Sequence, residues 1–228
     1  MSSSSELLAN VSIFKGLSAQ ALTRLATSLQ PLRFAKDALI VGQDDHGDAL
    51  YIIESGRVKV VLYGETGREI ILSVLSSGDF FGEMALLDKQ PRSANVVSIE
   101  DGEVLALDRD AFQNHLVGHP STALAILAEM SRRLRHADEV IGNLALLDVY
   151  ARVARAIRDL ALKQGEPVDG GVLIRERPTQ QEMAGLIGTS RETVSRALND
   201  FTRRGLLEMN GKQILVRWGF LRKLEEAA

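Results

Sequence analysis

The stretch FGEMALLDKQPRSANV, residues 81–96, decides the fold of the N-terminal half of this chain. Its glycine, Gly82, removes a side chain where a backbone must approach a partner closely. The short apolar helix expected from about Glu83 offers unpaired N–H groups, and its dipole favours an anion. Arg92 supplies a guanidinium fork suited to a phosphate, and the serine after it adds a hydroxyl. Because the Glu83 carboxylate can accept a bond from a sugar hydroxyl, the stretch predicts a site for a sugar joined to a phosphate. The alternative is a Glu83–Arg92 ion pair across a turn stiffened by Pro91.

The same string resembles the phosphate-binding cassette of the cyclic-nucleotide-binding domain family. The resemblance covers its Phe-Gly-Glu-x-Ala-Leu opening and its Pro-Arg-Ser-Ala close. It implies that a nucleotide binds here and that Glu83 takes the ribose hydroxyl. The residues that the resemblance assigns to the phosphate are Gly82 with the nearby amides of Met84 and Ala85, Arg92 and Ser93.

Length and charge indicate two functional parts. The 228 residues, 45% of them apolar, are enough for two domains. The net charge of −3 is uneven, because residues 1–120 carry 10 basic and 16 acidic side chains whereas residues 173–228 carry 10 and 7. A basic C-terminal third behind an acidic body is expected of a polyanion-binding module on a sensor, although a solvated helix face would look similar.

Several protein classes are unlikely on composition. The sequence contains no run of roughly eighteen apolar residues, so no membrane span is predicted. The first residues do not resemble a signal peptide. The absence of cysteine excludes a disulfide framework, a thiolate-bound cluster and a cysteine nucleophile, and fits a cytoplasmic protein. We therefore expect a cytoplasmic protein that makes no membrane contact.

The pattern along the chain predicts an α+β fold. Residues 34–107 alternate short β-rich runs with glycines, which favours a β-roll of the jelly-roll kind, with a hairpin at Ser55-Gly56. We expect a β-roll domain at 1–120, a dimerisation helix at 121–147 and a DNA-binding domain at 148–228.

The helix expected at 121–147 carries a narrow apolar seam with spacings of three and four residues. Such an a/d pattern over three heptads suits a two-stranded coiled coil, and hence a homodimer. The alternative is a helix packed on its own β-domain. The seam consists of Leu127, Met130, Leu134, Ala137, Ile141 and Leu144.

Residues 179–204 read as two helices joined by a tight turn. Thr179 and Glu182 form a capping box for the first helix, Gly188 allows the turn, and Ser190 caps the second helix. The segment MNGKQILV beyond them predicts a hairpin, as in a winged helix-turn-helix. An ordinary helical hairpin with a charged face is the alternative.

The whole chain, from about Ile13 to Arg217, resembles the catabolite activator and fumarate-nitrate regulator (CRP/FNR) family of bacterial transcription factors. The resemblance is strongest in GNLALLDV (142–149) and GTSRETVSRAL (188–198). It implies double-stranded DNA and RNA polymerase as partners. In the cyclic-AMP-responsive branch, residues corresponding to Arg191, Glu192 and Arg196 contact base edges, which predicts a palindromic TGTGA-like site. The residues expected at the DNA are Thr179, Gln180, Gln181, Ser190, Arg191, Glu192, Thr193, Ser195, Arg196 and Lys212.

The base of the nucleotide must be read outside the cassette. The cyclic-AMP branch carries a Thr-Ser pair on the dimer helix, where this chain has Ala137-Asp138. An ionised carboxylate matches the two adjacent N–H donors of guanine. Arg135 and Asp138 also form an R-x-x-D pattern that resembles cyclic di-GMP sites. We therefore expect cyclic di-GMP, then cyclic GMP, ahead of cyclic AMP. The alternatives are cyclic AMP bound through altered contacts, no small ligand, or a simple Arg135–Asp138 ion pair.

The sequence does not predict an enzyme. The four histidines, at positions 46, 115, 119 and 136, have no metal-ligand spacing beside a carboxylate, and no activated serine or paired-carboxylate motif is present. We expect no metal, haem or iron-sulfur cluster. A different class of function stays open at this stage, namely a nucleotide-binding regulatory subunit that acts on a protein.

Overall fold

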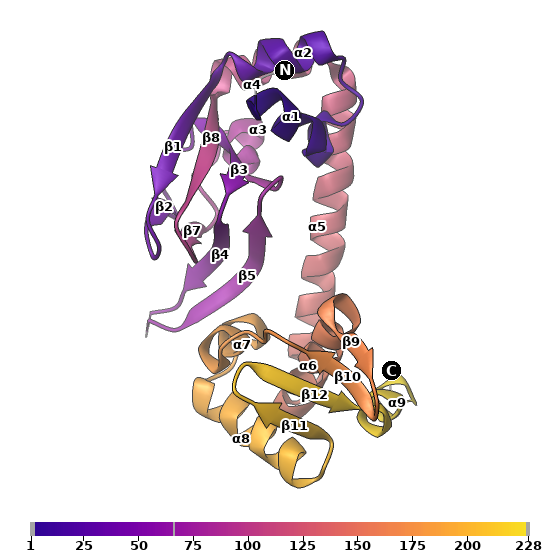
Figure 1. The fold of residues 1–228 in the computed structure, drawn as a ribbon. Coiled ribbons are helices and arrows are strands. Elements are labelled where there is room, and N and C mark those ends of the chain that lie inside the picture. The colour runs from indigo at the N-terminus through magenta and orange to yellow at the C-terminus, as the bar shows by residue number, and fades with distance from the viewer. Residues whose placement is uncertain (1–2, 66, 227–228) are drawn as a thin grey trace. The chain divides into compact units, whose positions relative to one another are not determined.

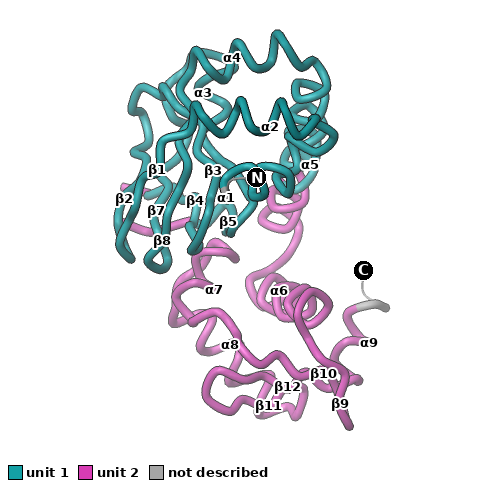
Figure 2. The backbone as a smooth tube through the Cα atoms, turned by 45° about the horizontal axis from the view of Figure 1, so that its top comes forward, with its two compact units in different colours: residues 1–63, 71–136 teal, residues 64–70, 137–228 magenta. Residues whose placement is uncertain are grey.

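The computed structural model describes residues 3–65 and 67–226 and divides into two compact units (Figures 1 and 2). The first unit comprises residues 1–63 and 71–136, and the second comprises residues 64–70 and 137–228. Among the described residues, no helix combines the length and the apolar character that a bilayer crossing requires.

Two four-stranded sheets form the β-roll. The first has the order β1-β8-β3-β6, with bounds Leu29–Phe34, Gly102–Asp108, Ala49–Ser55 and Phe80–Phe81. The second has the order β2-β7-β4-β5, with bounds Leu39–Val41, Asn95–Ser98, Arg57–Tyr63 and Glu69–Ser76. This arrangement confirms the predicted β-roll.

The expected hairpin at Ser55-Gly56 is wrong in its pairing. Gly56 does turn the chain, with φ 82°, and a Cβ there would lie 2.8 Å from the Asp101 carbonyl oxygen. The strands on either side enter different sheets, however, because β3 pairs with β6 and β8 whereas β4 pairs with β7 and β5. The turn therefore links the two sheets instead of closing a hairpin.

Helices pack against the roll and contribute side chains to its core. The N-terminal ones are α1 (Ser3–Asn10), the 3₁₀ turn η1 (Ser12–Phe14) and α2 (Ala19–Ala26), followed later by α3 (Glu83–Asp88) and α4 (Arg109–Gly118). The buried side chains of Phe14 in η1, Phe112 in α4 and Phe80 in β6 belong to one core together with Leu50 and Ile52 of β3. Burial of such large apolar groups is the main stabilising contribution to the unit.

The long helix α5, Pro120–Leu146, matches the helix expected at 121–147. Its first half belongs to the roll: Ile126 lies in the core, and Met130 is half-buried against the same core. Met130 therefore packs inside its own unit, which the alternating spacing did not reveal. The other large residues of the seam are exposed, namely Leu127, Leu134, Ile141 and Leu144. Leu124, which lies on α5 outside the seam, is also exposed.

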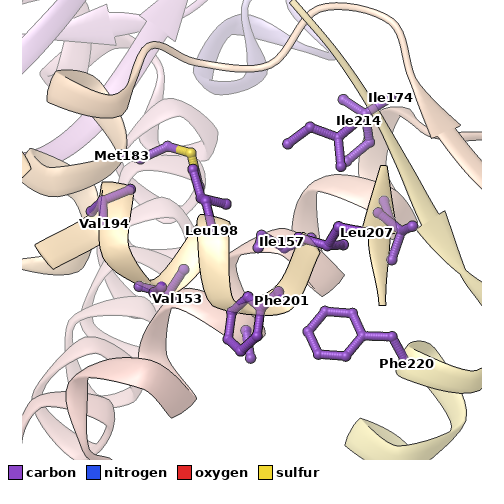
Figure 3. Close-up of a cluster of buried hydrophobic side chains, with 14 of the residues drawn as sticks. Val153, Ile157, Ile174, Met183, Val194, Leu198, Phe201, Leu207, Ile214 and Phe220 are labelled. Atoms are coloured by element: carbon purple, nitrogen blue, oxygen red, sulfur yellow. The ribbon is translucent and has the colours of Figure 1, made fainter. Parts of the chain in front are cut away.

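The second unit is a winged helix-turn-helix. Its helices are α6 (Val149–Gln164), α7 (Gln180–Ile187), α8 (Arg191–Arg203) and α9 (Trp218–Glu226). Its sheet has the order β11-β12-β10-β9, with bounds Leu207–Asn210, Gln213–Arg217, Gly171–Ile174 and Glu166–Val168. Figure 3 shows how Ile157, Leu198, Phe201 and Phe220 meet in one apolar core. Trp218 begins α9, and its side chain is partly exposed. Its backbone N–H donates a hydrogen bond to the Gly170 carbonyl oxygen.

Candidate nucleotide site and nucleic-acid interface

Arg92 is a buried cation that has only neutral partners. It is 5% exposed, and its Nη1 and Nη2 donate to the carbonyl oxygens of Gly82 at 2.6 Å and Ala49 at 2.9 Å. Its guanidinium lies 5.6 Å from the ring centre of Tyr51. No carboxylate within residues 3–65 and 67–226 forms an ion pair with it, and the alternative Glu83–Arg92 pair is not formed. Because a buried charge without a counter-charge is costly, this position favours a bound anion.

Two glycines make room for the guanidinium. Gly82 precedes α3 in the left-handed region, with φ 88°, and a Cβ on it would lie 2.5 Å from Arg92 Nη1. A Cβ on Gly47 would lie 2.5 Å from the Ala85 Cβ and 2.7 Å from Arg92 Cζ. The close approach predicted for Gly82 is therefore present, and Gly47 adds a second one.

Arg109 supports the same loop from the other side. Its Nη2 donates to the Ala85 carbonyl oxygen at 3.2 Å and forms a short hydrogen bond to the Gly47 carbonyl oxygen. Its Nη1 donates to the Leu86 carbonyl oxygen at 3.3 Å. Arg109 thus holds the carbonyl end of α3 and the Gly47 loop together.

Glu83 is 2% exposed and half-satisfied. Its Oε1 accepts a hydrogen bond from Arg133 Nη1 at 3.0 Å, whereas its Oε2 is buried and has no partner. Burial raises the pKa of the Glu83 carboxyl, and the Arg133 guanidinium lowers it in part. An orphaned oxygen in such a position can accept a hydrogen bond from a ligand hydroxyl.

The sequence reasoning missed Arg133, Glu129, Arg109 and Gly47. Arg133 Nε donates to Glu129 Oε1 at 2.9 Å, and this i,i+4 spacing was the only local signal of the network. Fifty residues separate Arg133 from Glu83, so the sequence pattern alone does not pair them.

The remaining cassette residues differ in exposure. Met84 is 47% exposed, and the exposed Ser93 hydroxyl lies 3.8 Å from the Met84 Sδ. Ala85 is buried beneath the helix. The structure therefore brings together Gly82, Glu83, Ala85 and Arg92, and leaves Met84 and Ser93 open to solvent.

Arg135 and Asp138 are both exposed on α5. Within the described residues, no hydrogen bond or ion pair joins them, although they stand three residues apart. The simple i,i+3 pair considered above is therefore not formed.

The helix-turn-helix has the predicted caps. Thr179 Oγ1 accepts from the Glu182 N–H at 3.2 Å, and Glu182 Oε2 accepts from the Thr179 N–H at 2.7 Å. Gly188 ends α7 with φ 71°, and Ser190 Oγ accepts from the Thr193 N–H at 3.2 Å. The capping box, the turn glycine and the second cap are confirmed.

Helix α8 has one buried and one open face. Its buried residues are Val194, Ala197, Leu198 and Phe201. On the open face Arg191, Glu192 and Arg196 are exposed, and Arg196 Nη2 donates to Thr193 Oγ1 at 3.3 Å. The Glu192 backbone N–H, and then the Ser190 hydroxyl, hold the pKa of the Glu192 carboxyl below its ordinary value. An ionised acceptor beside two arginines is a set of groups that reads base edges.

The other residues expected at DNA belong to the start of α7, the start of α8 and the turn between β11 and β12. Thr179, Gln181 and Ser190 are exposed, whereas Gln180, Thr193 and Ser195 are half-buried. Lys212 is exposed in the turn between β11 and β12, and its carbonyl oxygen accepts from the Arg177 N–H at 2.9 Å.

His115 and His119 pack against each other. Their rings stack with centroids 4.5 Å apart, and His115 Nε2 lies 3.1 Å from the Thr122 Oγ1. Burial, and then the neighbouring His119, lower the pKa of His115 to about 4. No group of three or more His, Asp or Glu side chains in the described parts of the chain is placed to hold a metal ion.

Comparisons with known proteins match both halves of the chain. The model of the cyclic nucleotide-binding domain family matches residues 31–119, and that of the Crp-like helix-turn-helix domain matches residues 151–224. The CRP-like cAMP-activated global transcriptional regulator of Mycobacterium tuberculosis is 35% identical over 211 residues, which cover 92% of this chain and 94% of that protein. The cyclic AMP receptor protein of Thermus thermophilus is 37% identical over 216 residues, which cover 95% and 96%.

A solved structure has a similar fold. The c-di-GMP-responsive global regulator CLP of Xanthomonas campestris superposes with a TM-score of 0.76 at 26% identity, over 88% of this chain and 99% of that one. The chain therefore belongs to the CRP/FNR family of transcription regulators, in which a cyclic nucleotide-binding domain precedes a Crp-like helix-turn-helix domain.

Proposed function

We propose that the protein is a homodimeric, cyclic-nucleotide-responsive transcription regulator that binds a palindromic TGTGA-like DNA site. The observation that carries the ligand is the buried guanidinium of Arg92, which forms no ion pair, in the same cassette as the orphaned oxygen of Glu83. One requires an anion and the other a hydroxyl donor. A ribose 3′,5′-cyclic phosphate carries both groups.

Calorimetry with cyclic AMP, cyclic GMP and cyclic di-GMP tests the ligand class. In Arg92→Gln the phosphate charge would lose its partner, at a cost of about 2–5 kcal/mol in nucleotide affinity. This corresponds to a weakening of roughly 30-fold or more at 25 °C. Equal affinity in the wild type and in Arg92→Gln would contradict the assignment.

For the base, we propose guanine, read by Asp138. An ionised carboxylate accepts from both N1–H and N2–H₂ of guanine but finds no matching pair of donors on adenine. The exposure of Asp138, and its lack of an ion pair with Arg135, support this proposal. The c-di-GMP response of the Xanthomonas neighbour points the same way.

Cyclic AMP is the second candidate, because the Mycobacterium and Thermus relatives carry cyclic AMP in their names. Calorimetry on Asp138→Ala separates the two candidates. The guanine proposal expects Asp138→Ala to abolish the preference for guanine over adenine. Tight cyclic AMP binding that Asp138→Ala leaves unchanged would favour the second candidate.

The DNA-binding half is supported by the open face of α8. Arginine binds guanine O6 and N7 bidentately, and glutamate accepts from cytosine N4. In a dimer, the two α8 helices would enter successive major grooves ~34 Å apart. A gel-shift assay with TGTGA-containing DNA tests this, because a regulatory subunit that acts on a protein would give no sequence-specific, salt-sensitive shift.

The exposed leucines of α5 support the dimer, since a stripe of large apolar side chains in water favours a second helix against it. The nucleotide would change DNA binding only through a different affinity for two arrangements of the dimer. RNA polymerase is the further partner that a regulator of this family would contact.

A further inference from the structure

Arg133 is shared between two largely buried carboxylates of the first unit. Its Nη1 donates to Glu83 Oε1 at 3.0 Å, its Nε donates to Glu129 Oε1 at 2.9 Å, and its Nη2 donates to the Phe80 carbonyl oxygen at 3.0 Å. The guanidinium also lies 4.8 Å from the centre of the Phe80 ring. Every nitrogen of the guanidinium therefore has a partner.

The two carboxylates are satisfied to different degrees. Both oxygens of Glu129 accept hydrogen bonds, Oε1 from Arg133 and Oε2 from Arg132. Glu83 accepts only through Oε1, and its Oε2 is buried without a partner. Glu129 therefore has a hydrogen-bond partner at each oxygen, whereas Glu83 has one oxygen without a partner.

This division is not what an isolated arginine and carboxylate would adopt. A guanidinium prefers to engage both oxygens of one carboxylate through two parallel N–H bonds. Here Nε is committed to Glu129 and Nη2 to the Phe80 carbonyl, so only Nη1 reaches Glu83. Removal of the Glu129 charge would release Nε, so the guanidinium would be free to rotate, exchange the Nη2 bond to the Phe80 carbonyl, and engage both oxygens of Glu83 through Nη1 and Nη2.

We propose that Glu129 is a positioning residue that, through Arg133, reserves Glu83 Oε2 for the 2′-hydroxyl of the ligand ribose. The proposal rests on the cyclic nucleotide function given above. Glu129 is suited to the task because it stays ionised: burial alone would raise its pKa, but the hydrogen bonds from Arg132 and Arg133 outweigh burial and hold the pKa below its ordinary value. It is 9% exposed, so solvent screens its pull on Arg133 only weakly.

The test compares 3′,5′-cyclic AMP and 3′,5′-cyclic GMP with their 2′-deoxy counterparts by calorimetry on the full chain. A hydrogen bond to a charged group predicts that the wild type prefers the ribose form by about tenfold or more. In Glu129→Gln, which keeps the shape of the side chain, this preference is expected to fall to within about twofold. Affinity for the 2′-deoxy forms should stay near the wild-type value, because the phosphate contacts are untouched.

Arg132→Gln is the matched control. It removes the partner of Glu129 Oε2 but leaves the Glu129 charge and its contact with Arg133, so the preference for the 2′-hydroxyl should persist. If Glu129→Gln does not fold, Glu129→Met fills a similar volume without the charge and should show the same loss of preference.

The outcomes are distinguishable. A wild-type protein that binds neither these four nucleotides nor cyclic di-GMP would overturn the proposed function and this inference with it. A wild-type protein that binds cyclic di-GMP but none of the four would overturn this inference and leave the proposed function standing. A Glu129→Gln variant that keeps the full preference, or that loses affinity for ribose and 2′-deoxy forms alike, would overturn the positioning role alone.

Discussion

Arg92 Nη1 donates to the carbonyl oxygen of Gly82 at 2.6 Å, so the guanidinium is held by the same residue whose missing side chain makes room for it. Any Cβ at position 82 would lie 2.5 Å from that nitrogen. The backbone bond and the steric gap therefore depend on each other, and both are lost together when Gly82 is replaced.

Gly82→Ala should damage both stability and nucleotide binding. The positive φ of 88° costs a non-glycine residue about 1–2 kcal/mol. Displacement of Arg92 should weaken nucleotide binding by roughly tenfold or more. Urea unfolding and calorimetry measure the two effects. Gly78→Ala is the control, because Gly78 has the same φ of 88° with nothing within 4 Å of its added Cβ. It should lose stability but keep nucleotide affinity.

Arg196→Ala should relax the DNA sequence preference. If Arg196 binds guanine bidentately, its loss should cost about 1–3 kcal/mol at one base position and leave the other positions unchanged. Competition gel shifts with single-base variants of the site measure this. Lys212→Ala on the wing should instead weaken binding to all sequences equally and reduce the salt dependence. A uniform loss in Arg196→Ala would make Arg196 a phosphate contact.

Replacement of Leu134 by Asp should convert the protein to a monomer. Leu134 is 64% exposed on α5, and a charge in an apolar seam leaves a carboxylate desolvated in the dimer. Sedimentation velocity gives the mass. Leu162→Asp is the control, since Leu162 is 71% exposed on α6, outside the seam. A Leu134→Asp protein that stays dimeric would show that the seam lies elsewhere.

Stability should fall on acidification because of His115. Its pKa is lowered to about 4 in the folded chain, so the unfolded chain takes up a proton between about pH 6.5 and 4 that the folded chain refuses. Stability is full above this window and should drop by about 2 kcal/mol between pH 7 and pH 5. His115→Gln should remove this component. Urea unfolding at the two pH values provides the measurement, with the exposed His46→Gln as the control. An unchanged slope in His115→Gln would contradict the assignment.

Local motifs predicted their own geometry well. The capping box at Thr179 and Glu182 and the turn at Gly188 depend on residues within a few positions, and both are present. Long-range partners were not predictable in the same way. Arg133 meets Glu83 only because α5 packs on the roll, and nothing in the spacing of the two residues encodes that contact.

Strand periodicity has a related limit. The alternation on either side of Gly56 predicted two strands and a turn, but a period of two residues does not say which sheet each strand joins. Residues 166–168 contain a proline, yet they form β9 at a sheet edge, where proline is tolerated. Met130 fits an a/d seam by spacing but packs on its own core.

The position of Trp218 has a practical consequence. It is the one tryptophan of the chain and lies at the start of α9, in the DNA-binding unit. Because it is partly exposed, its emission responds to local solvent. Intrinsic tryptophan fluorescence of the unmodified protein therefore reports on this unit alone, and nucleotide added to the roll changes the signal only when the effect reaches the DNA-binding half.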